Sequence, residues 1–283
     1  DGTVVRYRLS IQAGDKETFA DEGRYFACYI ADDPAPGWTQ HAVVYQIFVD
    51  RFFPGNGREW LEPDTLSGFF GGALQGIRDK LPYLADLGIN TLWLTPIFPS
   101  PSHHGYDATS LFEVEPRLGT TADLRDLCLD AHGQDMRVLL DFVPNHWSNL
   151  HPTFQEALHN PKSPYRAWYT FKGGLDEYES FFGVESMPQL NLRNPGARQH
   201  LLEAVRYWLD VGVDGYRLDY AVGPAHDFWA DFRKSTYEAQ PQAWTFGEVV
   251  EPPDSQLRFE GQLNGCLDFM LLEALRQSLA FGA

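Results

Sequence analysis

The sequence predicts an α/β fold, because short apolar runs alternate with helical patterns from about residue 41 onward. Strands that alternate with helices form a parallel sheet joined by right-handed crossovers. Six such β/α units are recognisable, and 283 residues are enough for a (β/α) barrel, which typically takes about 250. With 43% of its residues apolar, the chain can also build a well-buried core.

Residues 1–38 precede this alternation and predict β structure followed by a linker. Apolar and polar residues alternate over 5–11, a period of two that predicts a strand. Residues 24–30 predict a second strand, and the proline- and glycine-containing stretch 31–38 predicts a linker. Since two strands alone are marginal in water, we expect this segment to pack on the domain that follows it or to end a larger β domain.

The first three β/α units occupy 39–144. Three short apolar runs predict their strands, at 43–49, 91–94 and 137–143. Apolar residues recur at helical spacing over 74–87, and Gly88 ends that helix. A further helix is expected over 122–131, with Thr120 as its cap.

Residues 145–195 interrupt the alternation and are rich in aromatic residues, proline and glycine, so we expect an excursion rather than a β/α unit. The alternation returns in units four to six, over 196–283. Strands are expected at 215–218, 244–247 and 265–269. Helices are expected at 197–211, 227–239 and 271–280.

The formal charge of −17 bears on the partners of the protein. A strongly acidic surface repels phosphate backbones, so we expect no nucleic-acid partner. No apolar run approaches the roughly 18 residues that span a bilayer, and we expect no membrane partner. Solubility is the simpler explanation of the charge, and a neutral polymer such as a sugar is not repelled by it.

Cysteine usage bears on the compartment. The three cysteines, Cys28, Cys128 and Cys266, are odd in number and widely spaced, which argues against a zinc site and against a disulfide framework. Unpaired thiols favour a reducing compartment, so a cytoplasmic location is favoured over secretion.

Three successive predicted strands end in polar residues. Their sequences are DFVPNH at 141–146, GYRLD at 215–219 and GE at 247–248. In a β/α barrel the active site lies at the carboxyl ends of the strands. An isolated acid at a strand end is more often a helix cap or a turn residue, but three in succession predict a shared site. We therefore expect Asp141, Asp219, Glu248, Arg217 and His146 to converge.

Two carboxyl groups on either side of a scissile bond are what glycoside hydrolysis requires. Arg217 and Asp219 lie on the same face of their strand, so the guanidinium favours the charged form of Asp219. Glu248 is expected to hold a proton if it lies near carboxylates and away from the arginine. This predicts Asp219 as the nucleophile and Glu248 as the acid and then the base.

The loop HHGYD at 103–107 follows the second strand of the barrel. Adjacent histidines point apart in an extended segment, so we do not expect His103 and His104 to share a metal ion. Tyr106 has two interpretations: a platform that stacks on a sugar ring, or a packing aromatic with a satisfied hydroxyl.

Several strings, in this order, resemble the α-amylase family of glycoside hydrolases, over residues 41–283. They are AVVYQIFVDRF at 42–52, DFVPNH at 141–146, MPQLN at 187–191, GYRLD at 215–219 and GE at 247–248. The MPQLN string resembles the branch that contains neopullulanase, cyclomaltodextrinase and maltogenic amylase. Five strings in the same order are far more specific than any one alone.

The resemblance implies a (β/α)8 TIM-type barrel of which the first six units are present. It implies that 1–38 is the end of an N-terminal β-sandwich with its linker and that 145–195 is a small domain inserted after the third strand. Residues 39–144 and 196–283 are then barrel units one to three and four to six.

The resemblance also implies a role for each residue of the expected site. Asp219 would be the nucleophile and Glu248 the acid/base, in agreement with the argument from the residues. Arg217 would orient Asp219, and Asp141 would be a structural acid beside the arginine. The substrate-binding and supporting residues would be His146, which bonds the sugar, Tyr106, which stacks on it, and Asp107, which supports the loop.

The sequence departs from the family pattern at its ends. The fourth signature region, with a His-Asp pair at the seventh strand, is absent, so we expect a chain truncated at both ends. That Asp is the third carboxylate of the family, and its absence leaves open whether the chain alone is active.

The resemblance bears only weakly on cofactors and oligomers. We expect no required cofactor and no metal site. Calcium stays a weak alternative, because Asn145 matches a common calcium ligand but residues 220–224, YAVGP, lack the Lys-His of calcium-binding amylases. A homodimer is an open possibility, since this branch often dimerises through its N-terminal domain.

The sequence therefore predicts a retaining hydrolase of α-1,4 bonds in maltodextrins, cyclodextrins or pullulan, acting through a covalent glycosyl-enzyme intermediate, with α-1,6 bonds left open as a second linkage. Two alternatives stay open. One is a transglycosylase with the same chemistry. The other is an inactive amylase-like scaffold or sugar-binding protein.

Overall fold

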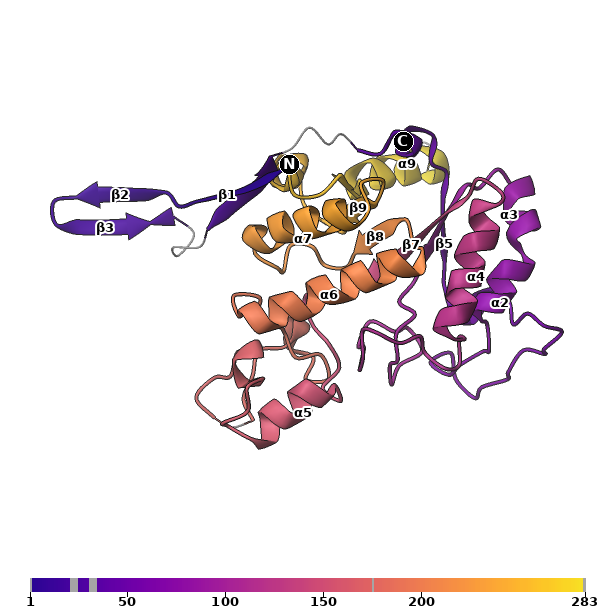
Figure 1. The fold of residues 1–283 in the computed structure, drawn as a ribbon, viewed down its shortest axis with the longest axis horizontal. Helices are drawn as coiled ribbons and strands as arrows, with labels where there is room; N and C mark the ends of the chain where they lie inside the picture. Colours follow the sequence, from indigo (N-terminus) through magenta and orange to yellow (C-terminus); the bar gives the residue numbers. More distant parts are fainter. Residues whose placement is uncertain (1, 21–24, 31–34, 175, 282–283) are drawn as a thin grey trace.

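The computed structural model describes residues 2–20, 25–30, 35–174 and 176–281 (Figure 1). Its centre is a parallel sheet of six strands in the order β5-β6-β7-β8-β9-β10. Spatial order therefore follows chain order, as in a barrel whose strands are added one by one at the same edge. The prediction of a partial (β/α) barrel with six units is confirmed.

The bounds of these strands lie close to the predicted ones. They are β5 Val44–Ile47, β6 Thr91–Leu94, β7 Arg137–Phe142, β8 Gly215–Leu218, β9 Trp244–Gly247 and β10 Gly265–Cys266. The strand expected over 265–269 is shorter than predicted, because the following helix already begins at Phe269. The middle of the sheet is covered on both faces: five of the six residues of β7 are buried.

Helices alternate with these strands along the chain. The longer ones are α4 Thr121–His132, α6 Pro195–Val211, α7 His226–Ala239 and α9 Phe269–Phe281. The shorter ones are α1 Val49–Phe52, α2 Leu74–Asp79, α3 Leu81–Asp86, α5 Pro152–His159 and α8 Pro253–Gln256. Short 3-10 helices occupy Gly37–His41, Arg166–Trp168, Phe181–Gly183 and Leu257–Phe259. In the described part of the chain, no helix is both long and apolar enough to cross a membrane.

Local sequence explains where the helices begin. Thr120 accepts a hydrogen bond from the backbone of Asp123, whose carboxylate accepts one in return from Thr120, a capping box that starts α4 as predicted. Asn194 caps α6 in the same manner through its side-chain oxygen. The single helix predicted over 74–87 is wrong: it divides at Lys80, because Pro82 lacks an N–H and suits only the first turn of a new helix.

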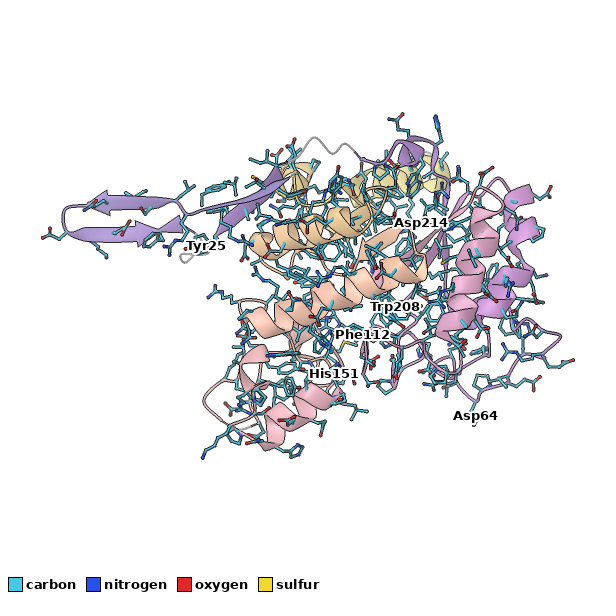
Figure 2. The ribbon with its side chains drawn as sticks, viewed as in Figure 1. Tyr25, Asp64, Phe112, His151, Trp208 and Asp214 are labelled. Atoms are coloured by element: carbon cyan, nitrogen blue, oxygen red, sulfur yellow. The ribbon has the colours of Figure 1, made fainter. Side chains whose placement is uncertain are left out.

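The core lies between the sheet and α6. Trp208 of α6 is fully buried, packs 5.6 Å from Phe98 between ring centroids, and donates its indole N–H to the carbonyl of Leu111 at 2.7 Å (Figure 2). A buried indole with its one donor satisfied adds apolar burial without leaving a polar group unpaired. This residue therefore fixes α6 against the loop that follows β6.

The N-terminal segment has four strands where two were predicted: β1 Thr3–Tyr7, β2 Ser10–Ala13, β3 Lys16–Phe19 and β4 Phe26–Ile30. β1 pairs with β4, whereas β2 and β3 form a separate hairpin that projects away from the body (Figure 1). The strand predicted over 5–11 breaks because β2 turns back on β3. Residue 24 and residues 31–34 of the predicted second strand and linker lie outside the described residues.

This segment packs on the barrel, as predicted. β1 and β4 both lie against α7, and the guanidinium of Arg6 binds the carboxylate of Asp231 on that helix. Arg198 of α6 binds Asp231 and Asp227, both at 2.7 Å. The network therefore joins the N-terminal strands to two barrel helices.

Gly215 opens β8 at φ +145°, and a Cβ atom there would lie 1.9 Å from the carbonyl oxygen of Trp244. We expect Gly215→Ala to lower the free energy of unfolding by about 3 kcal/mol or more, because both the backbone angle and the neighbouring strand oppose a methyl group. Denaturant unfolding followed by circular dichroism measures the change. Gly265→Ala, in β10 with nothing within 4 Å of the added carbon, is the matched control, and equal losses in both variants would contradict the argument.

Candidate active site

The strand register brings the predicted site residues together at one edge of the sheet. Asp141 of β7 is paired with Arg217 of β8. Beyond the last paired residues, the backbone N–H of Asp219 donates to Phe142 and that of Glu248 donates to Leu218, each at 2.9 Å. These bonds continue the sheet by one residue and fix the starting point of both acidic side chains. The convergence predicted from three successive strand ends is therefore present.

Arg217 is the common partner of the three carboxylates. Its Nη1 lies 2.8 Å from Oδ1 of Asp141 and 2.9 Å from Oδ1 of Asp219, and its Nη2 lies 2.8 Å from Oε1 of Glu248. The guanidinium, Asp141 and Asp219 are buried, whereas the side chain of Glu248 is 27% exposed. One cation therefore holds three anions, of which Glu248 is the most accessible.

One condition set by the sequence argument is not met. A proton on Glu248 was conditional on distance from the arginine, yet Glu248 is ion-paired with Arg217, and its second oxygen accepts the backbone N–H of Tyr220 at 3.1 Å. The guanidinium spans two neighbouring strands, and strand spacing alone does not reveal that reach. Both contacts fix the position of the Glu248 carboxyl group.

Burial controls the protonation of the other two acids. It raises the pKa of Asp219 to about 7, the charge of Asp141 adds to that rise, and Arg217 opposes it. Burial likewise raises the pKa of Asp141 to about 6, against the effect of Arg217. Burial lowers the pKa of Arg217, but the three carboxylates outweigh it and raise that pKa above its ordinary value. The guanidinium acts on Asp219 in the predicted direction, but burial is the larger effect.

Tyr106 and Trp93 complete the surroundings of Asp141. The hydroxyl of Tyr106 and the indole N–H of Trp93 both donate to its Oδ2, each at 3.0 Å. The two interpretations of Tyr106 are therefore not exclusive, since its hydroxyl is satisfied and its ring adjoins the carboxylates. Asp107 accepts hydrogen bonds from Ser100 at 2.7 Å and from Ser102, which ties the loop together.

His146 is buried, and its ring stacks on Phe181 with centroids 4.4 Å apart. Burial lowers its pKa to about 4, so the imidazole is neutral at neutral pH. Among the described residues, none forms a hydrogen bond with its Nε2 atom. The histidine thus offers one unsatisfied polar atom in a buried position, which a ligand group can satisfy.

The residues around Asn145 do not fit a calcium ion. Its side-chain oxygen accepts a hydrogen bond from Gln189 at 3.3 Å, and Gly223 approaches so closely that a Cβ atom would lie 2.1 Å from that oxygen. Calcium takes six to eight oxygen ligands. Within the described ranges, no three His, Cys, Asp or Glu residues are grouped to hold a metal ion.

The aromatic residues of the excursion divide into two groups. Trp147 and Tyr169 are buried and pack edge-on with their ring centroids 6.4 Å apart, so they belong to the core of the excursion. Phe182 is an exception: 77% exposed, it lies 5.3 Å from the ring of Tyr220. Both residues have positive φ, 49° and 44°. Positive φ costs about 1–3 kcal/mol for such residues and is concentrated at functional sites.

Sequence reasoning missed Tyr220 and Trp93 as parts of the site. Tyr220 follows Asp219 directly, but nothing in the string shows that its backbone turns to φ 44° and reaches Glu248. Trp93 lies in the second barrel strand with its indole directed at Asp141. The only signal for Trp93 was its position near the carboxyl end of a predicted strand.

A (β/α) barrel with acidic residues gathered at the carboxyl ends of its strands defines a barrel enzyme of the glycoside hydrolase type. The family described as "Alpha amylase, catalytic domain" matches residues 46–272. The chain belongs to the alpha-amylase family, and the resemblance drawn from its motifs is confirmed.

Individual relatives agree with this assignment. Alpha-amylase 2 of Dictyoglomus thermophilum is 42% identical over 86% of this chain and 43% of its own length. Neopullulanase 2 of Thermoactinomyces vulgaris is 33% identical over 87% of this chain and 45% of its own. The ligand-free cyclic α-maltosyl-(1→6)-maltose hydrolase from Arthrobacter globiformis superposes with a TM-score of 0.82, at 32% identity, over 88% of this chain and 60% of that one. The chain thus spans less than half the length of these curated relatives.

The raised pKa of Asp219 predicts a pH-dependent effect of Asp219→Asn on stability. Between the ordinary value of 3.8 and about 7, the folded chain binds more protons at this carboxyl group than the unfolded chain does. Stability therefore falls as pH rises through that window. We expect Asp219→Asn to raise the thermal midpoint at pH 8 and to have a shrinking effect towards pH 4, measured by calorimetry.

The control for this prediction is Asp86→Asn at the exposed end of α3. It should shift the midpoint by a similar small amount at every pH. If Asp219→Asn lowers the midpoint by the same amount at pH 4 and pH 8, burial of the charge does not determine the effect of the substitution.

Proposed function

We propose that the protein is a retaining glycoside hydrolase that cleaves α-1,4 bonds in maltodextrins, cyclodextrins or pullulan, with α-1,6 bonds left open as a second linkage. The observation that carries the proposal is the contact of one guanidinium with Asp219 and Glu248. Retaining enzymes separate their two carboxyl groups by about 5–5.5 Å and inverting enzymes by about 6.5–9.5 Å. A single arginine that bridges both carboxylates favours the shorter separation.

In the first step, Asp219 attacks the anomeric carbon as a carboxylate while Glu248 gives a proton to the departing sugar oxygen. In the second step, Glu248 takes a proton from water, and the oxygen of that water displaces Asp219. The accessibility of Glu248 supports this assignment, because the proton-transfer residue must reach both the leaving group and water. Its contacts with Arg217 and Tyr220 hold its carboxyl group in place for both steps.

The remaining residues position the sugar and the nucleophile. We assign to Arg217 the orientation of Asp219, and to Asp141 the support of the arginine from its other side. His146 would bond a sugar hydroxyl through its unsatisfied Nε2 atom. Tyr106 would stack on the same sugar ring, with Asp107 holding the loop.

We expect Asp219→Asn to lower kcat on maltoheptaose and β-cyclodextrin by about 10⁴-fold or more, because the amide cannot form the glycosyl ester. Glu248→Gln should lower it by about 10²–10⁴-fold, the usual contribution of general acid–base catalysis. Release of reducing sugar measures both. Asp86→Asn is the matched control, and wild-type release that survives Asp219→Asn would contradict the assignment of the nucleophile.

The protonation of Asp219 also predicts the acid side of the pH profile. Because the nucleophile must be ionised and burial raises its pKa to about 7, kcat/KM should fall about tenfold per pH unit well below pH 7. Initial rates at low maltoheptaose concentration from pH 4 to pH 9 test this. A profile that stays level down to pH 5 would exclude a buried, protonated Asp219 in the free protein.

A further inference from the structure

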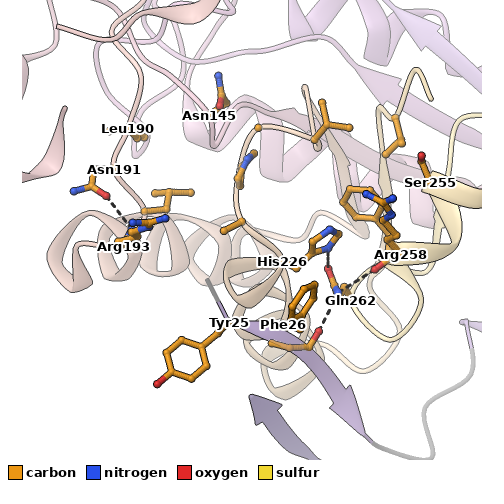
Figure 3. Close-up of a pocket in the computed structure, with 18 of the residues that line it drawn as sticks. Tyr25, Phe26, Asn145, Leu190, Asn191, Arg193, His226, Ser255, Arg258 and Gln262 are labelled. Carbon is orange, nitrogen blue, oxygen red and sulfur yellow. Dashed lines mark hydrogen bonds between the residues drawn. The ribbon is translucent and has the colours of Figure 1, made fainter. Parts of the chain in front are cut away.

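A cavity of about 1150 Å³ lies beside the reaction centre and is separate from the cluster around Arg217. Four segments that are distant in sequence form its walls: the N-terminal strands, the excursion over 145–193, the loop before α7 and the segment after β9 (Figure 3). Small-molecule sites usually measure about 300–1,000 Å³. This cavity is large enough for several sugar units rather than one.

The walls of this cavity are fixed to one another by a buried side chain. Gln262 is 4% exposed; its Nε2 atom donates to the carbonyl of Ala27 at 2.9 Å, and its Oε1 atom lies 2.8 Å from Nδ1 of His226. In addition, the backbone N–H of Tyr29 donates a hydrogen bond to the carbonyl of Gly261 at 2.9 Å. The N-terminal strand β4 is thereby held against the barrel, and the cavity is preformed.

Planar polar groups and aromatic rings share the lining. Arg193 and Arg258 line opposite parts of it, and within the described ranges neither guanidinium has a hydrogen bond or ion pair to another residue (Figure 3). Both residues are exposed, so their guanidinium donors are open to a ligand. Tyr7 and Phe26 stack at 5.5 Å on one side of the cavity.

This combination matches a neutral polyhydroxyl ligand. A guanidinium offers five donors in a fixed fork, which suits neighbouring hydroxyl pairs, and aromatic faces suit the apolar faces of sugar rings. An anion is disfavoured, because Glu179 and Glu251 share the lining and the chain as a whole carries a charge of −17.

The cavity adjoins the reaction centre through two short segments. Val249 follows Glu248 directly, and the loop that begins at Tyr220 lines the cavity from Val222 to His226. The backbone N–H of Ala221 donates to the carbonyl of Glu248 at 3.0 Å, which joins the two segments. The cavity and the reaction centre are therefore built on the same two segments.

We infer that this cavity is a remote subsite that binds a stretch of α-glucan away from the bond being cleaved, with Arg193 and Arg258 as its hydrogen-bond donors. The identity of the ligand rests on the proposed function. Binding energy from a remote part of a substrate raises kcat/KM for chains long enough to reach it. The N-terminal strands are then part of the substrate site rather than only a neighbouring domain.

The test compares the Arg193→Ala, Arg258→Ala double variant with the wild-type chain. We expect the affinity for maltoheptaose, measured by isothermal titration calorimetry, to fall about tenfold, the equivalent of about 1.4 kcal/mol. We also expect kcat/KM to fall more for maltoheptaose than for maltotriose. Arg125→Ala, an exposed arginine on α4, is the matched control and should change neither quantity. The thermal midpoint verifies that each variant is folded.

The outcomes separate the two proposals. If the wild-type chain hydrolyses glucan and the double variant keeps its kcat/KM on maltoheptaose, the remote subsite is overturned and the proposed function is retained. The same holds if kcat/KM falls equally for maltoheptaose and maltotriose. Maltoheptaose binding that depends on the two arginines, without any hydrolysis, overturns the function and retains the subsite. Absence of maltoheptaose binding by the folded wild-type chain, or tighter binding of inorganic phosphate, also overturns the subsite.

Discussion

The site depends on one buried cation. Removing a guanidinium or a carboxylate from water costs several kcal/mol for each ion, and only close, well-oriented contacts offset that cost. Arg217 achieves this with Asp141, Asp219 and Glu248 because the register of β7, β8 and β9 fixes all of their backbones. The balance is incomplete: three carboxylates face one cation. Burial raises the pKa of Asp141 and of Asp219, and for Asp219 the charges of the other two carboxylates add to that rise.

The loop after β8 is held by hydrogen bonds to the same ion cluster. Tyr220 is held at φ 44°, and its N–H donates to Glu248 while the next N–H donates to the carbonyl of the same residue. Strain of about 1–3 kcal/mol at a non-glycine residue persists only where surrounding bonds over-determine it. Here those bonds end on a carboxylate that Arg217 also holds. The loop geometry and the ion cluster therefore stabilise each other.

Much of this arrangement could be predicted from the sequence. Alternation and apolar periodicity located the strands within a few residues, and the polar strand ends predicted that Asp141, Arg217, Asp219 and Glu248 meet. The sequence did not predict how far the side chain of Arg217 extends. It contacts Glu248 because the guanidinium spans two strands. The division of the predicted helix could have been predicted, because Pro82 is present in the sequence and suits only the first turn of a helix. The wide cavity was beyond sequence reasoning, since four separate segments enclose it.

The N-terminal strands connect these observations to substrate length. Gln262 joins β4 to the segment after β9, and that segment leads back to Glu248. One segment of the chain therefore connects the N-terminal strands to Glu248. A glucan bound across both regions would contact a single preformed surface, so little ordering would be needed on binding. Preorganisation of this kind reduces the entropic cost of binding a long and flexible ligand, which is the physical reason to expect longer chains to be preferred.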